Sequence, residues 1–321
     1  MTKTRKRQPR PTQKVWIFVG WILQWILRLI IAVIGVSVVA GTLVAVWRTH
    51  TSPPPNPAVI NTVDSQRSLP EVPPIPSPEL QEQLTKLVPA NGSMQVVALE
   101  LTSGSYVNLG GEQAIASGGI IALPVLVAGL QDLDNRKMQW DELIDRGKIT
   151  VQRALVDMIK VSDHTATNLL IGRLGGNSAL NRRFQEWGLR NTKLNNALPD
   201  RDGQNTTSAS DLVRLLSLVE RGQLLQLRSR DRFWDILART TENDLLPVGI
   251  SAEARIFHKS GETNNSIGDT GMVDMPNGKR YLVAVFVKGV QDKESARELI
   301  RTCSNTIYTY LVRLGQQAEN P

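Results

Sequence analysis

The sequence has little cysteine and, over its first 48 residues, no acidic side chain. A single cysteine, Cys303, excludes an intramolecular disulfide and therefore a small disulfide-rich scaffold. Its place in an apolar helical pattern predicts a core residue. The hydrophobic fraction of 41% excludes a fully disordered chain. We expect neither a bound metal nor a cofactor.

The net charge of +7 is concentrated at one end of the chain. Residues 1–48 hold eight of the 37 lysines and arginines and none of the 30 acids, so the other 273 residues carry 29 basic and 30 acidic side chains. A domain that binds nucleic acid would carry an excess of positive charge of its own. We therefore expect no nucleic-acid partner.

A long apolar run follows the basic residues. Residues 29–47 carry no charge and would form a helix about 28 Å long, which matches a bilayer core. Residues 15–27 extend this run, and tryptophans mark both of its ends, as they do at membrane interfaces. We predict a basic cytoplasmic tail (1–14) and a single-pass membrane anchor (15–48, with the span at 29–47). A cleaved signal peptide remains an alternative.

The charge asymmetry also predicts the topology. Positive residues before the span keep the N-terminus in the cytoplasm, so the rest of the chain is expected in the periplasm or another extracytoplasmic space. Residues 51–78 contain nine of the 17 prolines. Such a segment favours extended conformations, and we interpret 49–79 as a spacer, with a ligand for a partner domain as the alternative.

The remaining chain (80–315, before a short tail at 316–321) has strand patterns at both ends and helical patterns between them. Strands are predicted at 94–101, 106–109, 255–258, 271–275 and 280–287. Helices are predicted at 118–137, 151–159, 165–174, 178–187, 208–221, 227–239 and 293–314. This order predicts an α+β domain whose antiparallel sheet is formed by both ends, with a helical block between them.

Three short motifs lie in this domain in a characteristic order. They are Gly119-Ile120-Ile121-Ala122-Leu123-Pro124, then Ser162-Asp163-His164, then Lys259-Ser260-Gly261 followed by Gly268-Asp269-Thr270-Gly271. Together they resemble the S-x-x-K, S-D-N and K-T-G motifs of the class A β-lactamase and penicillin-binding-protein superfamily of serine acyltransferases. The resemblance covers roughly residues 80–315 and implies a bacterial envelope protein.

The resemblance places the nucleophile at Gly119 and its base at Ala122, so both reactive groups are missing. No lysine lies between Lys86 and Lys137 to replace the base. Ser117 is the one nearby hydroxyl. Its use as the nucleophile would shift the motif by two residues and rotate the buried stripe of the helix by about 200°. We interpret Ser117 as a helix N-cap whose oxygen accepts a backbone N–H.

The other two motifs are partly retained. By resemblance Ser162 relays a proton, while His164 stands where the family has asparagine. Ser162 or Asp163 could also simply cap the following helix. Lys259, Ser260 and Gly261 are implied to bind the carboxylate of a ligand, with Ser260 in place of threonine.

The loop acid of the β-lactamase branch is also missing, because no glutamate lies between Glu186 and Glu220. Asp200 and Asp202 lie in that loop, where acids next to proline and glycine usually shape the turn.

These observations favour a membrane-anchored, non-catalytic binding protein of the cell envelope. Its expected partners are the membrane together with peptidoglycan, a β-lactam-like ligand or envelope proteins. Two alternatives remain open: an active serine hydrolase of the β-lactamase or D,D-peptidase type that uses Ser117 or Ser162, and a structural envelope spacer.

Overall fold

The computed structural model describes residues 73–290 and 292–319. The predicted cytoplasmic tail, the membrane anchor and most of the proline-rich spacer lie outside these residues. Within the described ranges, no helix has both the length and the apolar character needed to cross a bilayer.

A six-stranded sheet forms the centre of the domain, in the order β1-β3-β2-β10-β9-β8. The strands are β1 (Ile75–Pro76), β2 (Ser93–Glu100), β3 (Ser105–Leu109), β8 (Arg255–Glu262), β9 (Ser266–Asp274) and β10 (Arg280–Lys288). Both ends of the domain supply strands, which confirms the prediction. The sheet is not wholly antiparallel, because the two-residue β1 runs parallel to β3.

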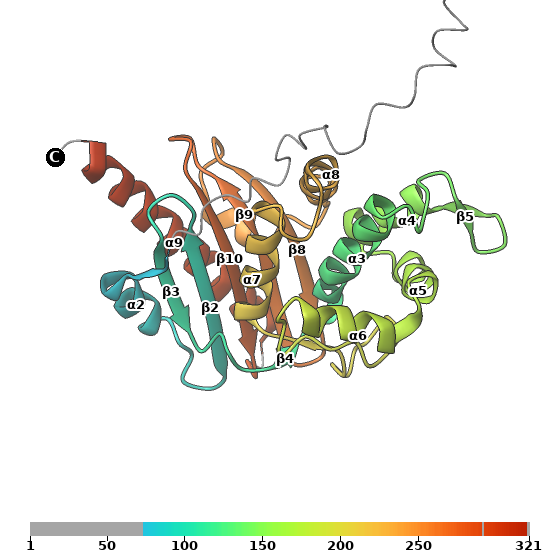
Figure 1. The fold of residues 1–321 in the computed structure, drawn as a ribbon. Coiled ribbons are helices and arrows are strands. Elements are labelled where there is room, and N and C mark those ends of the chain that lie inside the picture. Colours follow the sequence, from blue (N-terminus) through green and yellow to red (C-terminus); the bar gives the residue numbers. More distant parts are fainter. Residues whose placement is uncertain (1–72, 291, 320–321) are drawn as a thin grey trace, which may run out of the picture. The chain divides into compact units, whose positions relative to one another are not determined.

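Helices cover both faces of this sheet (Figure 1). One face packs against α2 (Pro78–Thr85) and α9 (Lys293–Glu319), and the other against α7 (Ala209–Glu220). The helical block contains η1 (Gly118–Ile121), α3 (Ala122–Asp134), α4 (Val151–Lys160), α5 (His164–Arg173), α6 (Gly176–Glu186) and α8 (Leu227–Leu237). Shorter elements are β4 (Ile115–Ala116), β5 (Leu143–Ile144), β6 (Ile149–Thr150), β7 (Thr206–Thr207) and η2 (Leu246–Gly249).

Strand β10 shows why one sheet can separate two cores. Its side chains alternate between the two faces, as strand geometry requires. The odd-numbered residues Tyr281, Val283, Val285 and Val287 belong to the core beneath α9. The even-numbered residues Leu282, Ala284 and Phe286 belong to the core on the helical-block side. An apolar strand in the middle of a sheet therefore has both faces buried.

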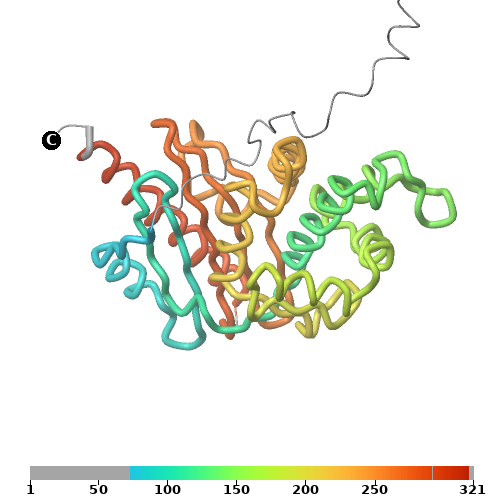
Figure 2. Tube along the Cα trace, viewed as in Figure 1, coloured from blue at the N-terminus to red at the C-terminus, as the bar shows by residue number. Residues whose placement is uncertain are grey.

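The described fold extends past the predicted domain limits at both ends. Helix α2 begins at Pro78, inside the range assigned to the spacer, and α9 continues into the predicted tail. These first and last helices lie side by side (Figure 2) and share an ion pair between Glu79 and Arg313. The buried Cys303 of α9 is a core residue, as predicted, and burial raises the pKa of its thiol to about 12.

Two elements near the motifs differ from their sequence expectation. The helix predicted at 118–137 begins as the 3-10 turn η1 and becomes α-helical at Ala122. Pro124 falls in the first turn of α3, where its missing N–H breaks no helical hydrogen bond. Strand β8 continues to Glu262, four residues past its predicted end, because its polar and glycine residues pair with β9 along its whole length.

Candidate functional site

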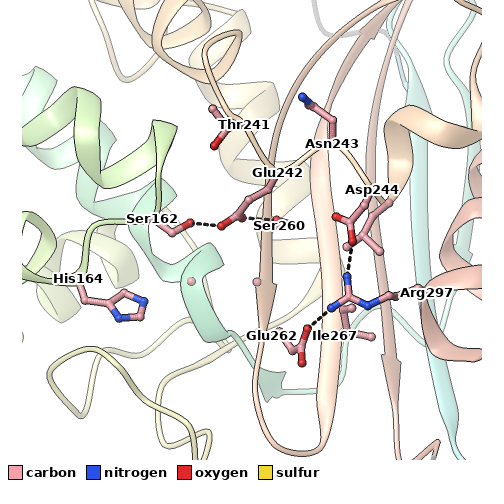
Figure 3. A pocket seen from close by; sticks show the side chains of 13 residues that line it. Ser162, His164, Thr241, Glu242, Asn243, Asp244, Ser260, Glu262, Ile267 and Arg297 are labelled. Atoms are coloured by element: carbon pink, nitrogen blue, oxygen red, sulfur yellow. Dashed lines mark hydrogen bonds and ion pairs between the residues drawn. The ribbon is translucent and has the colours of Figure 1, made fainter. Parts of the chain in front are cut away.

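A cavity of about 400 Å³ lies beside the edge strand β8, between η1, the start of α5 and the loop after α8 (Figure 3). The motifs that are far apart in the sequence meet here. Residues that line the cavity include Gly119, Ser162, His164, Glu242, Ser260 and Arg297.

Gly261 allows η1 to approach β8 this closely. A side-chain carbon at Gly261 would lie 2.8 Å from the backbone nitrogens of Gly119 and Ile120 and from the carbonyl oxygen of Ser117. Real carbon atoms do not approach so closely, so only glycine fits here. Of the three predicted ligand-binding residues, Gly261 therefore shapes the cleft, while Lys259 and Ser260 supply polar groups.

Lys259 is a charged side chain in the interior of the site, with 1% exposure. Its Nζ donates to Ser162 Oγ (2.6 Å), to the carbonyl oxygen of Ser260 (2.8 Å) and to Glu242 Oε2 (3.1 Å). An ammonium has three protons, so these contacts use all of its donors. Buried charges are normally paired in this way.

Ser162 lies in the turn between α4 and α5 with a φ of +53°. This left-handed conformation is uncommon for residues with a side chain, and such residues concentrate at functional sites. The neighbouring Asp163 caps α5, because its carboxylate accepts a hydrogen bond from Ala166 N at 2.9 Å. The capping interpretation of this motif is confirmed for Asp163. Ser162 does not cap the helix, and its side chain points into the cavity (Figure 3).

Glu242 completes this cluster, although nothing in the sequence indicated it. It lies in a polar loop after α8, 17 positions before Lys259, and matches no motif. Its Oε1 accepts from Ser162 Oγ (2.8 Å) and its Oε2 accepts from Ser260 Oγ (2.6 Å) and Lys259. One carboxylate therefore contacts Ser162, Ser260 and Lys259, and Figure 3 shows it between the two serines.

The ionisation of Glu242 reflects these contacts. Burial raises the pKa of the carboxyl group, but the Lys259 charge and the hydrogen bonds from Ser260, Ser162 and Lys259 outweigh it. The pKa of Glu242 therefore lies below its ordinary value of 4.5.

This lowered pKa predicts a pH effect. Ionised Glu242 stabilises the folded state at neutral pH, and this contribution is lost as the pH falls below about 4.5 toward the folded-state pKa. The Glu242→Gln variant has no carboxylate to protonate, so it does not lose this contribution. Melting temperatures recorded from pH 7 down to pH 3 should fall less for Glu242→Gln than for the wild type, and parallel curves would contradict the assignment.

The positions assigned to nucleophile and base carry no reactive group. Gly119 lines the cavity, and a side-chain carbon there would lie 3.6 Å from Lys259 Nζ and 3.5 Å from the carbonyl oxygen of Ser260. These are ordinary contact distances, so the position has room for a small side chain. Ala122 follows one turn later and is buried.

Ser117 does not act as predicted. It occupies the N-cap position of η1, but its hydroxyl accepts no backbone N–H and instead donates to the carbonyl oxygen of Asn205 at 3.1 Å. The N-cap interpretation is therefore wrong for its side chain, because Ser117 has helical dihedral angles (φ −82°, ψ −24°) and not the extended ones of an N-cap residue. The hydroxyl is buried and lies outside the residues that line the cavity.

His164 and the two loop acids take separate positions. The His164 ring points into the cavity (Figure 3), and within the described ranges no residue gives it a hydrogen bond. Asp200 is buried and accepts from the backbone nitrogens of Gln204 and Asn205, so it shapes its turn as expected. Asp202 is exposed and accepts from the side chain of Asn264. Neither acid lines the cavity.

A second buried pair, whose role the motifs did not indicate, lies behind the cleft. His258 Nδ1 donates to both oxygens of Asp269 (2.9 and 3.0 Å), and its Nε2 lies 3.1 Å from Asn243 Oδ1. Asp269 also accepts from Leu246 N at 3.2 Å. The pair therefore fixes the loop that carries Glu242.

Removal of Asp269 should destabilise the domain. Asp269→Ala leaves the His258 ring and Leu246 N without their acceptor, and each unpaired buried donor costs about 1–3 kcal/mol. Denaturant unfolding measures this loss. The exposed Asp231→Ala is the control and should change the free energy of unfolding by less than about 0.5 kcal/mol. Equal effects from both variants would contradict a supporting role for the pair.

Comparison with known proteins agrees with this geometry. A family model described as the Beta-lactamase enzyme family matches residues 79–311. The extended-spectrum β-lactamase PER-1 of Pseudomonas aeruginosa is 29% identical over 184 residues, which is 52% of this chain and 58% of PER-1. The carbapenem-hydrolysing β-lactamase KPC of Klebsiella oxytoca is 25% identical, covering 65% of this chain and 80% of KPC. The chain thus spans little more than half the length of PER-1.

Solved structures extend the match over nearly the whole described domain. PBP-A is 39% identical with a TM-score of 0.72, covering 75% of this chain and 99% of PBP-A. A point mutant of PBP-A, solved as an acyl-enzyme complex with penicillin G, gives 38% identity and a TM-score of 0.73, covering 76% of this chain and 100% of that one. The family model and these relatives together show that the chain belongs to the Beta-lactamase enzyme family.

Proposed function

We propose that the domain binds a carboxylate-bearing ligand without forming an acyl bond, and that it acts as a non-catalytic binding protein of the cell envelope. The observation that carries this proposal is the pair of small residues, Gly119 and Ala122, where the resemblance expects the nucleophile and its base. Acyl transfer needs an oxygen to attack and a base to take its proton. In serine hydrolases the loss of the nucleophile costs about a millionfold in kcat.

The retained polar groups support binding. Lys259 supplies a cation, and Ser162 and Ser260 supply hydroxyls, all directed at one carboxylate position. Charge-assisted hydrogen bonds of this kind are roughly twice as strong as neutral ones. The cavity beside them, with the free His164 ring on its wall, has room for the rest of a small ligand. A β-lactam or a peptidoglycan fragment with a free carboxylate fits this chemistry.

Equilibrium binding of penicillin G to the full chain tests the proposal. Titration calorimetry should detect a complex that dialysis reverses completely, with recovery of free, unaltered penicillin G. The absence of binding both to penicillin G and to peptidoglycan fragments would overturn the proposal.

The placement of the domain is part of the same proposal. The apolar run at 29–47 and the basic residues before it support a single-pass anchor with the domain outside the cytoplasmic membrane. Protease added to spheroplasts should then digest the domain. Protection in spheroplasts and digestion only after lysis would contradict this topology.

A second candidate function rests on the contact between Ser162 and Lys259. Their 2.6 Å separation brings a hydroxyl and an amine together, as in serine hydrolases that use lysine. Against this role, the ammonium has all three protons engaged, and Glu242, with its lowered pKa, is a weak base. Hydrolysis of a chromogenic cephalosporin that disappears in Ser162→Ala would establish this alternative.

A further inference from the structure

Glu242 has the partners that a ligand carboxylate would need. We infer that it is an internal ligand: its side chain occupies the anion subsite of the cleft, and a carboxylate-bearing ligand binds by displacing it. This inference deepens the proposed function and rests on it for the identity of the ligand.

While Glu242 is bound, the hydrogen-bond donors of Ser162, Ser260 and Lys259 are all engaged, so none is available to a second carboxylate. Ser162 donates to one carboxylate oxygen, and Ser260 and Lys259 donate to the other. The remaining donors of Lys259 contact Ser162 and the Ser260 carbonyl. A carboxylate that served only as the counter-ion of Lys259 would need to contact only Lys259. Glu242 also accepts hydrogen bonds from the hydroxyls of Ser162 and Ser260.

The loop around Glu242 is fixed, so only its side chain has to move. Both N and Oγ1 of Thr241 donate to the carbonyl oxygen of Lys160. On the other side, Asn243 contacts His258, and Asp244 forms an ion pair with Arg297. The Glu242 side chain itself is 40% exposed and borders the cavity. Rotation about its side-chain torsions is enough to vacate the subsite, because the open cavity lies beside it.

Self-occupancy weakens ligand binding by a calculable factor. A site that is open for one-tenth of the time binds its ligand tenfold more weakly than the same site held open. Removal of the Glu242 carboxylate should therefore tighten the binding of carboxylates, about tenfold at this open fraction and more if the site is open less often.

Formate, the smallest carboxylate, tests the subsite without reference to the natural ligand. In the full chain, Glu242→Ala leaves the buried Lys259 without its counter-ion, and sodium formate should raise its melting temperature relative to sodium chloride at equal ionic strength. Wild type should show no such difference. The exposed Glu253→Ala is the matched control and should behave as wild type. An equal formate response in wild type and Glu242→Ala overturns the inference.

Penicillin G separates this inference from the proposed function. Tighter binding to Glu242→Ala than to wild type supports both, whereas equal binding to the two proteins overturns self-occupancy and leaves the proposed function standing. If formate stabilises Glu242→Ala and neither protein binds penicillin G or peptidoglycan fragments, the internal ligand is upheld and the proposed function fails. Should Glu242→Ala not fold, Glu242→Gln removes the charge at constant size. Penicillin G must then bind more tightly to Glu242→Gln than to wild type, and unchanged binding overturns the inference.

Discussion

The double variant Gly119→Ser, Ala122→Lys is expected to form a covalent adduct with penicillin G where the wild type forms none. A side-chain carbon at Gly119 meets its neighbours at ordinary contact distances, so a serine fits beside Lys259 without displacing backbone. Ser162, Lys259 and Ser260 are already in place. The new lysine supplies the base that the position lacks.

The adduct of the double variant should persist. The loop near Asp200 has no glutamate to activate a water for deacylation, so we expect stoichiometric acylation with little turnover. Gly119→Ser alone is the control and should acylate about 10²- to 10⁴-fold more slowly, because it lacks the base.

The double variant also carries a risk that can be measured separately. Ala122 is buried, and an unpaired ammonium there would destabilise the helix. A melting curve distinguishes an unfolded variant from an inactive one. A folded double variant without any adduct would contradict our assignment of these two positions.

In the Glu242→Ala background, where no internal carboxylate competes for the subsite, Lys259→Met is expected to weaken ligand binding by about 10- to 150-fold. This range is the loss of one charge-assisted hydrogen bond, about 1.5–3 kcal/mol, converted at 1.4 kcal/mol per factor of ten. Methionine keeps the apolar stem of the side chain, so the packing around the stem is retained. Titration calorimetry with penicillin G provides the measurement.

Lys288→Met is the matched control for Lys259→Met, because Lys288 is an exposed lysine on β10, which β9 separates from β8, and its loss should leave binding unchanged. The comparison also tests the structural-spacer alternative. A spacer has no use for the cleft, so it predicts that Lys259→Met has no effect on envelope function, whereas a binding protein requires that function to fall with affinity.

The elements that local pattern determines were predictable from the sequence. The alternation in β10, the apolar stripes of α4 and α7 and the cap at Asp163 all depend on near neighbours in the chain, and each lies within a few residues of its predicted place. The extension of β8 to Glu262 was missed because pairing with β9, not local propensity, decides it.

The site was predictable only in part, for the same physical reason. Motif order located Ser162, Lys259 and Ser260, and the structure brings their side chains together around the Glu242 carboxylate. Glu242 has no motif and enters the site through the loop after α8, which a remote pair, His258 and Asp269, holds in place. Such tertiary partners leave no periodic signal in the chain. The direction of the Ser117 hydroxyl likewise depended on a carbonyl 88 residues away.

Intact-mass spectrometry of the wild-type full chain after incubation with penicillin G tests the absence of acylation most directly. The Gly119→Ser, Ala122→Lys protein serves as the acylating reference. We predict an unchanged wild-type mass under conditions in which calorimetry detects bound ligand. A stoichiometric gain of one penicillin mass, mapped by peptide sequencing to Ser162, would contradict the account.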